Sequence, residues 1–390
     1  MNAPRLNPQF DPAAFLLDYW QKRPLLIPGM VEFTDPLSPE ELAGLACEDG
    51  IESRLVLGAE RWRLRHGPFL EADFTALSSS NWTLLVQGID SYINEFSTLR
   101  DLFKFIPHWR LDDVMASYAA PGGGVGPHFD YYDVFLVQGS GQRSWQLGKK
   151  NQTTEPVQTE SGLSLLTEFE PEQEFILNPG DVLYIPPQYG HWGSAITESF
   201  CYSVGFRAPS AGEMLEGFSD ALIARADPAC RFTNTVGEEI RNPHEIGLQD
   251  LTAAYALVQD ELANFDGFCK WFGAYMTQPK YPELFQGLEK TPSAEALGSA
   301  IRSNQLDLLI NPATRLAFTL PVDRPTIYLF IDGRVYTLSQ SNSEAVKQLF
   351  EPTFSFNSFF STANPSEEIQ DLILAMLAEG SLLMRPLAQS

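Results

Sequence analysis

The sequence predicts an α+β protein in which a β-rich barrel or sandwich comes first and helical modules follow. Its 390 residues exceed the size of a single hydrophobic core, so two or three domains are expected. Short strand-like segments separated by Gly, Pro, Ser and Asn dominate the chain as far as about residue 206. After Arg207, apolar residues instead recur every three or four positions, as they do in helices.

The N-terminal half is expected to begin with a helix and to continue as strands. Helical spacing of apolar side chains covers 11–22, and Pro24 then ends it. The strands expected after this helix lie at 25–28, 61–64, 82–87, 113–118, 134–137, 144–147, 174–177, 182–185 and 200–206. Many short strands at close spacing are typical of a sandwich or a barrel.

The C-terminal half is expected to be mainly helical, with one hairpin. The hairpin is predicted where two β-branched and aromatic segments flank Asp332-Gly333, a dipeptide typical of two-residue turns. The helices expected in this half lie at 214–225, 248–275, 294–302, 341–349 and 366–377.

The charge of the chain constrains its partners. Fifty acidic and 26 basic residues give a formal net charge of −24, which repels phosphate backbones and anionic lipid. Direct binding to nucleic acid is therefore not expected. The same charge would attract a basic protein, although many acidic proteins have no such partner, and the composition leaves both interpretations open.

Cysteine content and hydropathy predict a cytoplasmic protein without a membrane segment. The four cysteines are far apart and form no CxxC pair, so neither a disulfide framework nor a zinc ribbon is indicated. The N-terminus lacks an apolar core behind a basic start, and no segment approaches the roughly 18 apolar residues that cross a bilayer.

An HxD triplet is the first sign of chemistry. His128 and Asp130 follow the glycine-rich segment 121–127 and precede the predicted strand at 134–137. On an extended chain, alternate side chains face the same way, so this imidazole and this carboxylate can point together into a barrel. The glycines lack the lysine of a phosphate-binding loop and are expected to shape the rim of the site.

A third candidate ligand is His191, which ends the segment GDVLYIPPQYGH. Two imidazoles and one carboxylate on one side of a metal leave three positions of an octahedron open, as in iron(II) oxygenases. A structural zinc site would instead be closed. The sequence therefore predicts an open metal site formed by His128, Asp130 and His191.

Charged and aromatic residues near the triplet suggest binding groups. Arg143 lies 13 residues after Asp130, and on a neighbouring strand it could face the interior, where a buried arginine needs an anionic partner. Its planar guanidinium fits the distal carboxylate of a dicarboxylic acid. Tyr131, Tyr132 and Asp133 could hold a cationic side chain, or they could pack outward as strand residues.

Three segments carry a resemblance to a known family. They read FLLDYWQKRPLLIPG, DVMASYAAPGGGVGPHFDYYDVFLVQGSGQRSWQLG and NPGDVLYIPPQYGHWGSA. In these segments the chain resembles the JmjC and cupin-type 2-oxoglutarate oxygenases, and more closely the bacterial ribosomal oxygenases, which hydroxylate an arginine of a large-subunit ribosomal protein. The likeness extends over nearly the whole chain.

The resemblance implies iron(II) bound by His128, Asp130 and His191, with 2-oxoglutarate and O2 as co-substrates. Arg143 matches the arginine that binds the co-substrate, and Ser117 matches a position that touches it, although a serine there could equally be filler. The reaction implied is 3-hydroxylation of an arginine in ribosomal protein 16 of the large subunit, coupled to the conversion of 2-oxoglutarate to succinate.

The resemblance also implies an architecture and a set of partners. It implies a double-stranded β-helix (jelly-roll) barrel of the JmjC/cupin type at 1–208, a helical homodimerisation module at 209–278 and a winged-helix-like domain at 279–390. The expected substrate is a basic ribosomal protein. In relatives the winged-helix part does not read DNA, which agrees with the acidic charge of this chain.

Other functions stay open at this point. A relative could hydroxylate a histidine of another ribosomal protein, and local spacing does not separate the two. A non-redox metal-binding cupin could use the same barrel as an interaction module. The HxD triplet and Arg143 argue against the non-redox alternative.

Overall fold

The computed structural model of the protein describes residues 3–58, 61–151, 157–158, 160–233, 244–320, 325–351, 354–362 and 365–387. The chain divides into two compact units, Met1–Ala208 and Pro209–Ser390. A further boundary near residue 278 stays a prediction.

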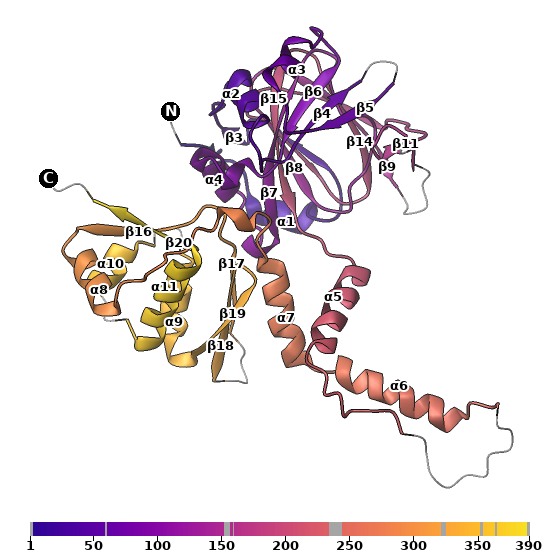
Figure 1. Ribbon diagram of the computed structural model, residues 1–390. Coiled ribbons are helices and arrows are strands. Elements are labelled where there is room, and N and C mark those ends of the chain that lie inside the picture. The colour runs from indigo at the N-terminus through magenta and orange to yellow at the C-terminus, as the bar shows by residue number, and fades with distance from the viewer. Residues whose placement is uncertain are drawn as a thin grey trace. The chain divides into compact units, whose positions relative to one another are not determined.

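A large antiparallel sheet forms the frame of the first unit (Figure 1). Its strands, in spatial order, are β2 (Leu25–Ile27), β13 (Val182–Ile185), β8 (Val134–Gln138), β15 (Ser199–Phe206), β7 (Leu111–Ala119), β6 (Trp82–Val86), β4 (Ser53–Leu57) and β5 (Arg63–His66). The central strands β8 and β15 are rich in β-branched and aromatic residues, which pack well on a pleated surface.

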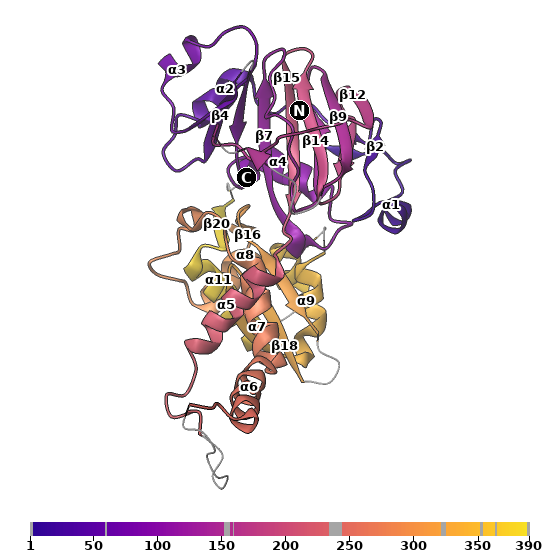
Figure 2. The ribbon, with the colours of Figure 1, turned by 90° about the vertical axis from the view of Figure 1, so that its right-hand side faces the viewer.

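A smaller sheet faces one side of the large sheet. It consists of β12 (Gln173–Leu177), β9 (Arg143–Lys150) and β14 (Tyr189–Ala195), which lie side by side in Figure 2. Apolar side chains from both sheets form one cluster between them: Val134, Leu136, Trp145, Leu147, Leu177, Leu183, Ile185 and Cys201. Two sheets with a shared interior form the predicted barrel, and the expected α+β class is confirmed.

Short helices cover the other face of the large sheet. They are α1 (Pro12–Asp18), α2 (Pro39–Leu45) and α4 (Asn94–Asp101), and they bury Phe15, Leu42, Phe96 and Leu99 in the core. The local sequence explains where two of these helices begin. Asp11 caps α1 by accepting from two backbone N–H groups, and Ser38 forms a capping box with Glu41 at α2.

The remaining short elements of this unit are α3 (Glu71–Thr75) and the strand pairs β1 (Arg5–Leu6) with β3 (Val31–Glu32) and β10 (Val157–Gln158) with β11 (Leu165–Leu166). Two single 3-10 turns, Ile89–Ser91 and His108–Arg110, flank α4.

A buried carboxylate on the helix-covered face ties the N-terminal segment to the sheet. Asp133 is fully buried and accepts a hydrogen bond from Tyr184 at 2.7 Å and one from the side chain of Gln21 at 3.2 Å. Arg110 completes its surroundings with an ion pair at 3.3 Å. The Tyr184 hydroxyl also accepts from the backbone N–H of Gln21 at 2.7 Å. Since a buried charge needs several partners, this network fixes the chain just after Asp130.

The second unit combines helices with two small sheets. Its helices are α5 (Ala211–Ile223), α6 (Leu248–Leu262), α7 (Phe265–Thr277), α8 (Ala294–Arg302), α9 (Ser343–Leu349), α10 (Phe356–Thr362) and α11 (Glu367–Glu379), with 3-10 turns at Pro282–Leu284 and Gln340–Asn342. Its strands are β16 (Leu306–Ile310), β17 (Leu316–Thr319), β18 (Thr326–Ile331), β19 (Arg334–Ser339) and β20 (Leu382–Pro386), paired in the orders β16-β20 and β17-β18-β19.

Close helix–sheet packing holds the second unit together. Gly273 in α7 lies against the ring of Phe330 in β18, where an added Cβ would come within 2.3 Å of the ring. At the end of the chain, Ser366 caps α11, and Gly380 ends it in the left-handed region at φ 81°. The core of this unit is formed by residues of α8, α11, β18 and their neighbours.

Most predicted elements are present, and the differences have local causes. The hairpin through Asp332-Gly333 is confirmed, with positive φ at both turn residues. The helical segment expected at 248–275 is present and consists of two helices, α6 and α7, which meet at Asn264. The Asn264 side chain accepts from the N–H of Gly267 and begins α7 as a new helix.

Replacing Tyr184 by Phe should destabilise the first unit through the Asp133 network. The substitution removes a donor to a buried carboxylate and the acceptor of the Gln21 N–H, so the free energy of unfolding should fall by about 2 kcal/mol. Urea denaturation measures this change. Tyr189→Phe is the control, because its hydroxyl makes one exposed bond to Lys22, and a loss of about 0.5 kcal/mol or less is expected. Equal losses in the two variants would contradict the role of the network.

Candidate active site

Two histidines and one aspartate meet at one end of the barrel interior. One ligand atom from each of His128, Asp130 and His191 can be chosen so that all three lie within 4.8 Å of one another. The Oδ2 atom of Asp130 lies 3.9 Å from Nε2 of His128 and 3.6 Å from Nε2 of His191. Among the residues that the structure describes, this is the one group of three or more such side chains with metal-binding spacing.

Backbone pairing brings the two histidines together. The N–H of His128 donates to the carbonyl of His191 at 3.0 Å, and the N–H of His191 donates back at 2.8 Å. The expectation that His128 and Asp130 lie on a regular strand is wrong, because this bridge is isolated and the chain is irregular around it. His191 lies within β14 and does not end a strand. The turn before β14 contains Gln188 at φ 71°.

Hydrogen bonds orient both imidazole rings. Nδ1 of His128 lies 2.9 Å from the carbonyl of Gly126, and Nδ1 of His191 lies 2.9 Å from the carbonyl of Tyr189. A ring that donates from Nδ1 presents the lone pair of Nε2 to the cluster. Burial, with the neighbouring His128, lowers the pKa of His191 to about 4, so its ring is neutral at neutral pH. Both features suit a divalent metal ion.

The glycine-rich segment allows the close approach of strands at the rim, as the sequence predicted. The N–H of Gly122 donates to Ala195, and Ala195 donates back to Gly123, both at 2.8 Å. A Cβ added to Gly124 would lie 2.2 Å from the carbonyl of Gly193, so a larger residue would push this segment away from β14. The glycines thus let the chain before His128 pair with the strand of His191.

Arg143 lies on β9, four residues before Leu147, the strand partner of His191, and is 5% exposed. Its guanidinium donates to the hydroxyl of Ser117 at 2.8 Å, to the hydroxyl of Ser199 at 3.0 Å, and to the carbonyls of both serines at 2.8 and 2.9 Å. None of the ion pairs found among the described residues includes Arg143. Burial lowers its pKa, but a guanidinium stays charged, so this cation is stabilised by neutral acceptors alone.

Comparison with known proteins identifies the family. The chain is 38% identical over 269 residues to the ribosomal protein uL16 3-hydroxylase of Escherichia coli. The aligned region covers 68% of this chain and 71% of that protein. The chain belongs to the ribosomal oxygenase family. A probable ribosomal oxygenase of Haemophilus influenzae is 31% identical over 315 residues, or 78% of this chain and 72% of that protein.

Domain and structural matches agree with this membership. A JmjC domain matches residues 98–214, and a ROXA-like winged helix matches residues 256–383. The E. coli ribosomal oxygenase YcfD superposes with a TM-score of 0.87 at 29% identity, covering 98% of this chain and 100% of that chain. YcfD has also been solved with cobalt and 2-oxoglutarate, and this complex matches with a TM-score of 0.82 over 96% of this chain. The predicted JmjC barrel and winged helix are confirmed.

The ribosomal oxygenase interior also carries a polar network that the sequence analysis missed. Asp113 and Ser117 lie on the same face of β7, since alternate residues of a strand share a face. Gln87 donates to both carboxylate oxygens of Asp113 at 3.0 and 2.9 Å, and Arg54 donates to Gln87 at 2.7 Å. The sequence shows the alternation of side chains within 113–118, which could have indicated this face of β7. It does not show that β4, β6 and β7 pair.

The tyrosines and the aspartate after the triplet divide between the two faces. Partial burial with the nearby Asp130 and Asp113 carboxylates raises the pKa of Tyr132, so the phenol keeps its proton. Tyr131 is 56% exposed. Asp133 belongs to the network on the opposite face of the sheet, where it contacts Tyr184, so it does not serve as the cation-binding group that the sequence left open.

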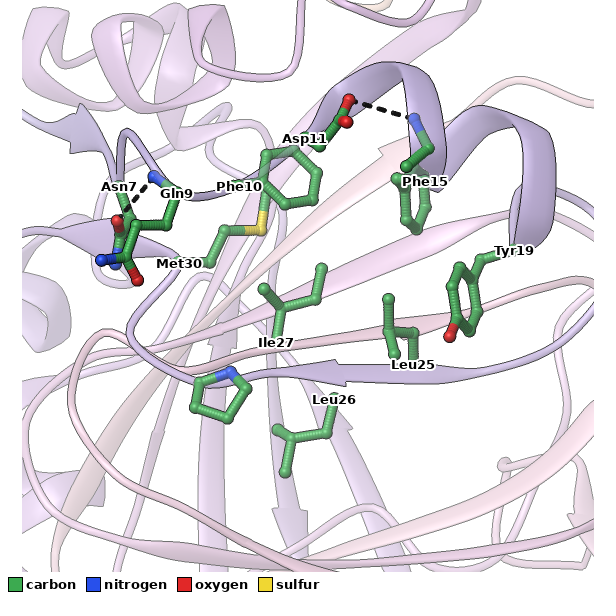
Figure 3. A pocket seen from close by; sticks show the side chains of 12 residues that line it. Asn7, Gln9, Phe10, Asp11, Phe15, Tyr19, Leu25, Leu26, Ile27 and Met30 are labelled. Atoms are coloured by element: carbon green, nitrogen blue, oxygen red, sulfur yellow. Dashed lines mark hydrogen bonds between the residues drawn. The ribbon is translucent and has the colours of Figure 1, made fainter.

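A separate hollow in this ribosomal oxygenase unit lies between α1 and β2 (Figure 3). Its volume is about 360 Å³, and its lining is mostly apolar, with Phe10, Phe15 and Ile27 among the lining residues. None of its lining residues belongs to the histidine–aspartate cluster.

None of the described helices is long and apolar enough to cross a membrane.

Metal binding by the purified protein should depend on the cluster. We expect His128→Ala to weaken Co(II) affinity more than about 100-fold, because even loss of a residue that only supports a metal ligand costs 10- to 100-fold. Titration calorimetry measures this affinity. His66→Ala on exposed β5 is the control and should bind as the unmodified protein does. Retained tight binding by His128→Ala would show that the ion is held elsewhere.

Proposed function

We propose that this ribosomal oxygenase is an iron(II)- and 2-oxoglutarate-dependent hydroxylase of ribosomal protein uL16, acting on an arginine side chain. The observation that carries the proposal is the open histidine–aspartate cluster in the same interior as a buried arginine, which has no carboxylate partner in the part of the chain that the structure describes. The E. coli relative is named for uL16 hydroxylation, and YcfD has been solved with 2-oxoglutarate, which supports the same assignment here.

The donor set fits iron(II). His128, Asp130 and His191 supply two neutral nitrogens and one carboxylate oxygen from one side, which leaves positions for a bidentate co-substrate and O2. Bound iron(II) supplies the oxidation in which one oxygen atom of O2 enters a substrate C–H bond and the other enters succinate as CO2 leaves. The chain contributes ligand geometry and a water-excluding apolar interior.

Arg143 and Ser117 would anchor the co-substrate. The guanidinium can pair with the distal carboxylate of 2-oxoglutarate while the keto acid end is held at the cluster. The hydroxyl of Ser117 already accepts from Arg143, so it positions the guanidinium and would lie beside the incoming carboxylate. An anionic ligand would neutralise a charge that now has only neutral partners.

An anionic group in the interior favours arginine over histidine as the target residue. Asp113 is buried on the face of β7 that also carries Ser117, and it lies close enough to Tyr132 to raise the pKa of that phenol. A guanidinium is charged at every physiological pH, whereas an imidazole is mostly neutral at pH 7, so a buried carboxylate complements arginine better.

Incubation with purified uL16, iron(II), 2-oxoglutarate and O2 tests the proposal. Mass spectrometry should detect a gain of one oxygen on a single arginine, with succinate formed in equal amount. His128→Ala should abolish both products. If the oxygen appears on a histidine, the histidyl alternative replaces the arginine proposal. If neither product forms, the interaction-module alternative is favoured.

Arg143→Gln should separate co-substrate binding from chemistry. Loss of charged hydrogen bonds to a carboxylate should raise the KM for 2-oxoglutarate about tenfold or more, because each such bond contributes about 1.5–3 kcal/mol. Succinate release measured against 2-oxoglutarate concentration gives this constant. Arg63→Gln on exposed β5 is the control, and its KM should not change. An unchanged KM in Arg143→Gln would remove Arg143 from the co-substrate site.

We further propose that the protein acts as a homodimer in the cytoplasm. Five apolar residues of α6 repeat at alternating spacings of three and four and are between 40% and 80% exposed: Leu248, Leu251, Tyr255, Val258 and Leu262. Such a stripe is typical of a helix that packs against another helix. The net charge of −24 supports a basic protein substrate and argues against direct nucleic-acid binding.

The double variant Leu251→Asp, Tyr255→Asp should be monomeric. Two carboxylates in the apolar stripe would be desolvated without partners in a helix pair, which costs more than the contact gains. Sedimentation velocity gives the molecular mass of the particle. Ala256→Asp, on another exposed face of α6, is the control and should leave the dimer intact. A monomeric unmodified protein would overturn the proposal.

A further inference from the structure

Trp145 presents an unsatisfied hydrogen-bond donor inside the barrel. It lies on β9 two residues after Arg143 and is 6% exposed, within the apolar cluster between the sheets. Its indole nitrogen is buried and has no hydrogen-bond partner among the residues that the structure describes. Buried donors nearly always have a partner, because an unpaired one costs about 1–3 kcal/mol.

The position of the ring is set by the backbone. Trp145 pairs directly with Gly193 across β9 and β14, and a Cβ added to Gly193 would lie 2.6–2.8 Å from three atoms of its six-membered ring. The indole therefore rests against the glycine backbone. The centroids of the Trp145 and His191 rings are 6.1 Å apart. Since His191 pairs with Leu147, the ring lies between the level of the metal cluster and that of Arg143.

We propose that the indole N–H of Trp145 donates a hydrogen bond to an oxygen of bound 2-oxoglutarate. This inference rests on the proposed function, because it requires the co-substrate to lie between the cluster and Arg143. A diacid in that position would pass along the indole and bring carboxylate or keto oxygens to a donor that has no partner among the described residues. Trp145 would be a binding residue for the co-substrate, distinct from the charged anchor.

Nuclear magnetic resonance of the full chain loaded with Zn(II) tests the contact without turnover, because zinc has no redox chemistry. Trp145→Phe or triple-resonance assignment identifies its signal among the indole N–H signals of the seven tryptophans. Adding 2-oxoglutarate should shift this signal downfield and slow its exchange with solvent. An unmoved signal at saturating 2-oxoglutarate would overturn the inference.

Affinities of the same Zn(II) form provide a second measurement. Trp145→Phe keeps an aromatic ring over Gly193 but lacks the donor. Its affinity for 2-oxoglutarate should therefore fall by more than about twofold and by up to about tenfold. Trp192→Phe is the matched control, because Trp192 is the neighbour of Gly193 on β14 and points to the other face of the strand. Its affinity should not change.

The outcomes separate this inference from the proposed function. If the unmodified protein does not bind 2-oxoglutarate, the proposed function fails. If the unmodified protein binds it and Trp145→Phe binds equally well, within about twofold, only the role of Trp145 fails. Thermal unfolding of the metal-free variants distinguishes a lost donor from a damaged fold, since a lost donor weakens binding without lowering the unfolding temperature of the metal-free protein.

Discussion

The interaction on which the barrel depends is the burial of the Arg143 guanidinium between two sheets. Arg143 belongs to β9 of the small sheet, and its acceptors Ser117 and Ser199 belong to β7 and β15 of the large sheet. Four hydrogen bonds thus join the sheets at this point in addition to apolar packing. Since neutral acceptors only partly replace the hydration of a cation, the folded chain keeps an affinity for an anion in its interior.

The metal-binding end follows from the same two-sheet arrangement. The chain leaves β7, passes through the glycine segment and pairs with β14 at the His128–His191 bridge before it enters β8. The glycines make this pairing possible, because a side chain at Gly124 would collide with β14. After Asp130 the chain is held from the opposite face by the Asp133 network. The carboxylate ligand therefore lies between two fixed points of the backbone.

Sequence alone could indicate the cluster and Arg143 because both depend on local patterns. The HxD spacing, the GDVLYIPPQYGH segment and the alternation after Gly141 can be read without knowing which strands pair. The network of Asp113, Gln87 and Arg54 could not be found in this way, since its members come from three segments that meet only in the folded sheet. The orphan donor of Trp145 is likewise a property of packing.

The fixed positions of the binding groups in the interior determine the length of the ligand that fits. Arg143, Trp145 and His191 lie on β9 and β14, and the register of this strand pair is fixed by backbone hydrogen bonds. The separation between the cationic anchor and the cluster therefore cannot adapt to the ligand. A rigid pair of anchors favours a diacid of one length, because a shorter acid would leave one end unpaired in a dry interior. Preorganisation of this kind gives selectivity without a moving part.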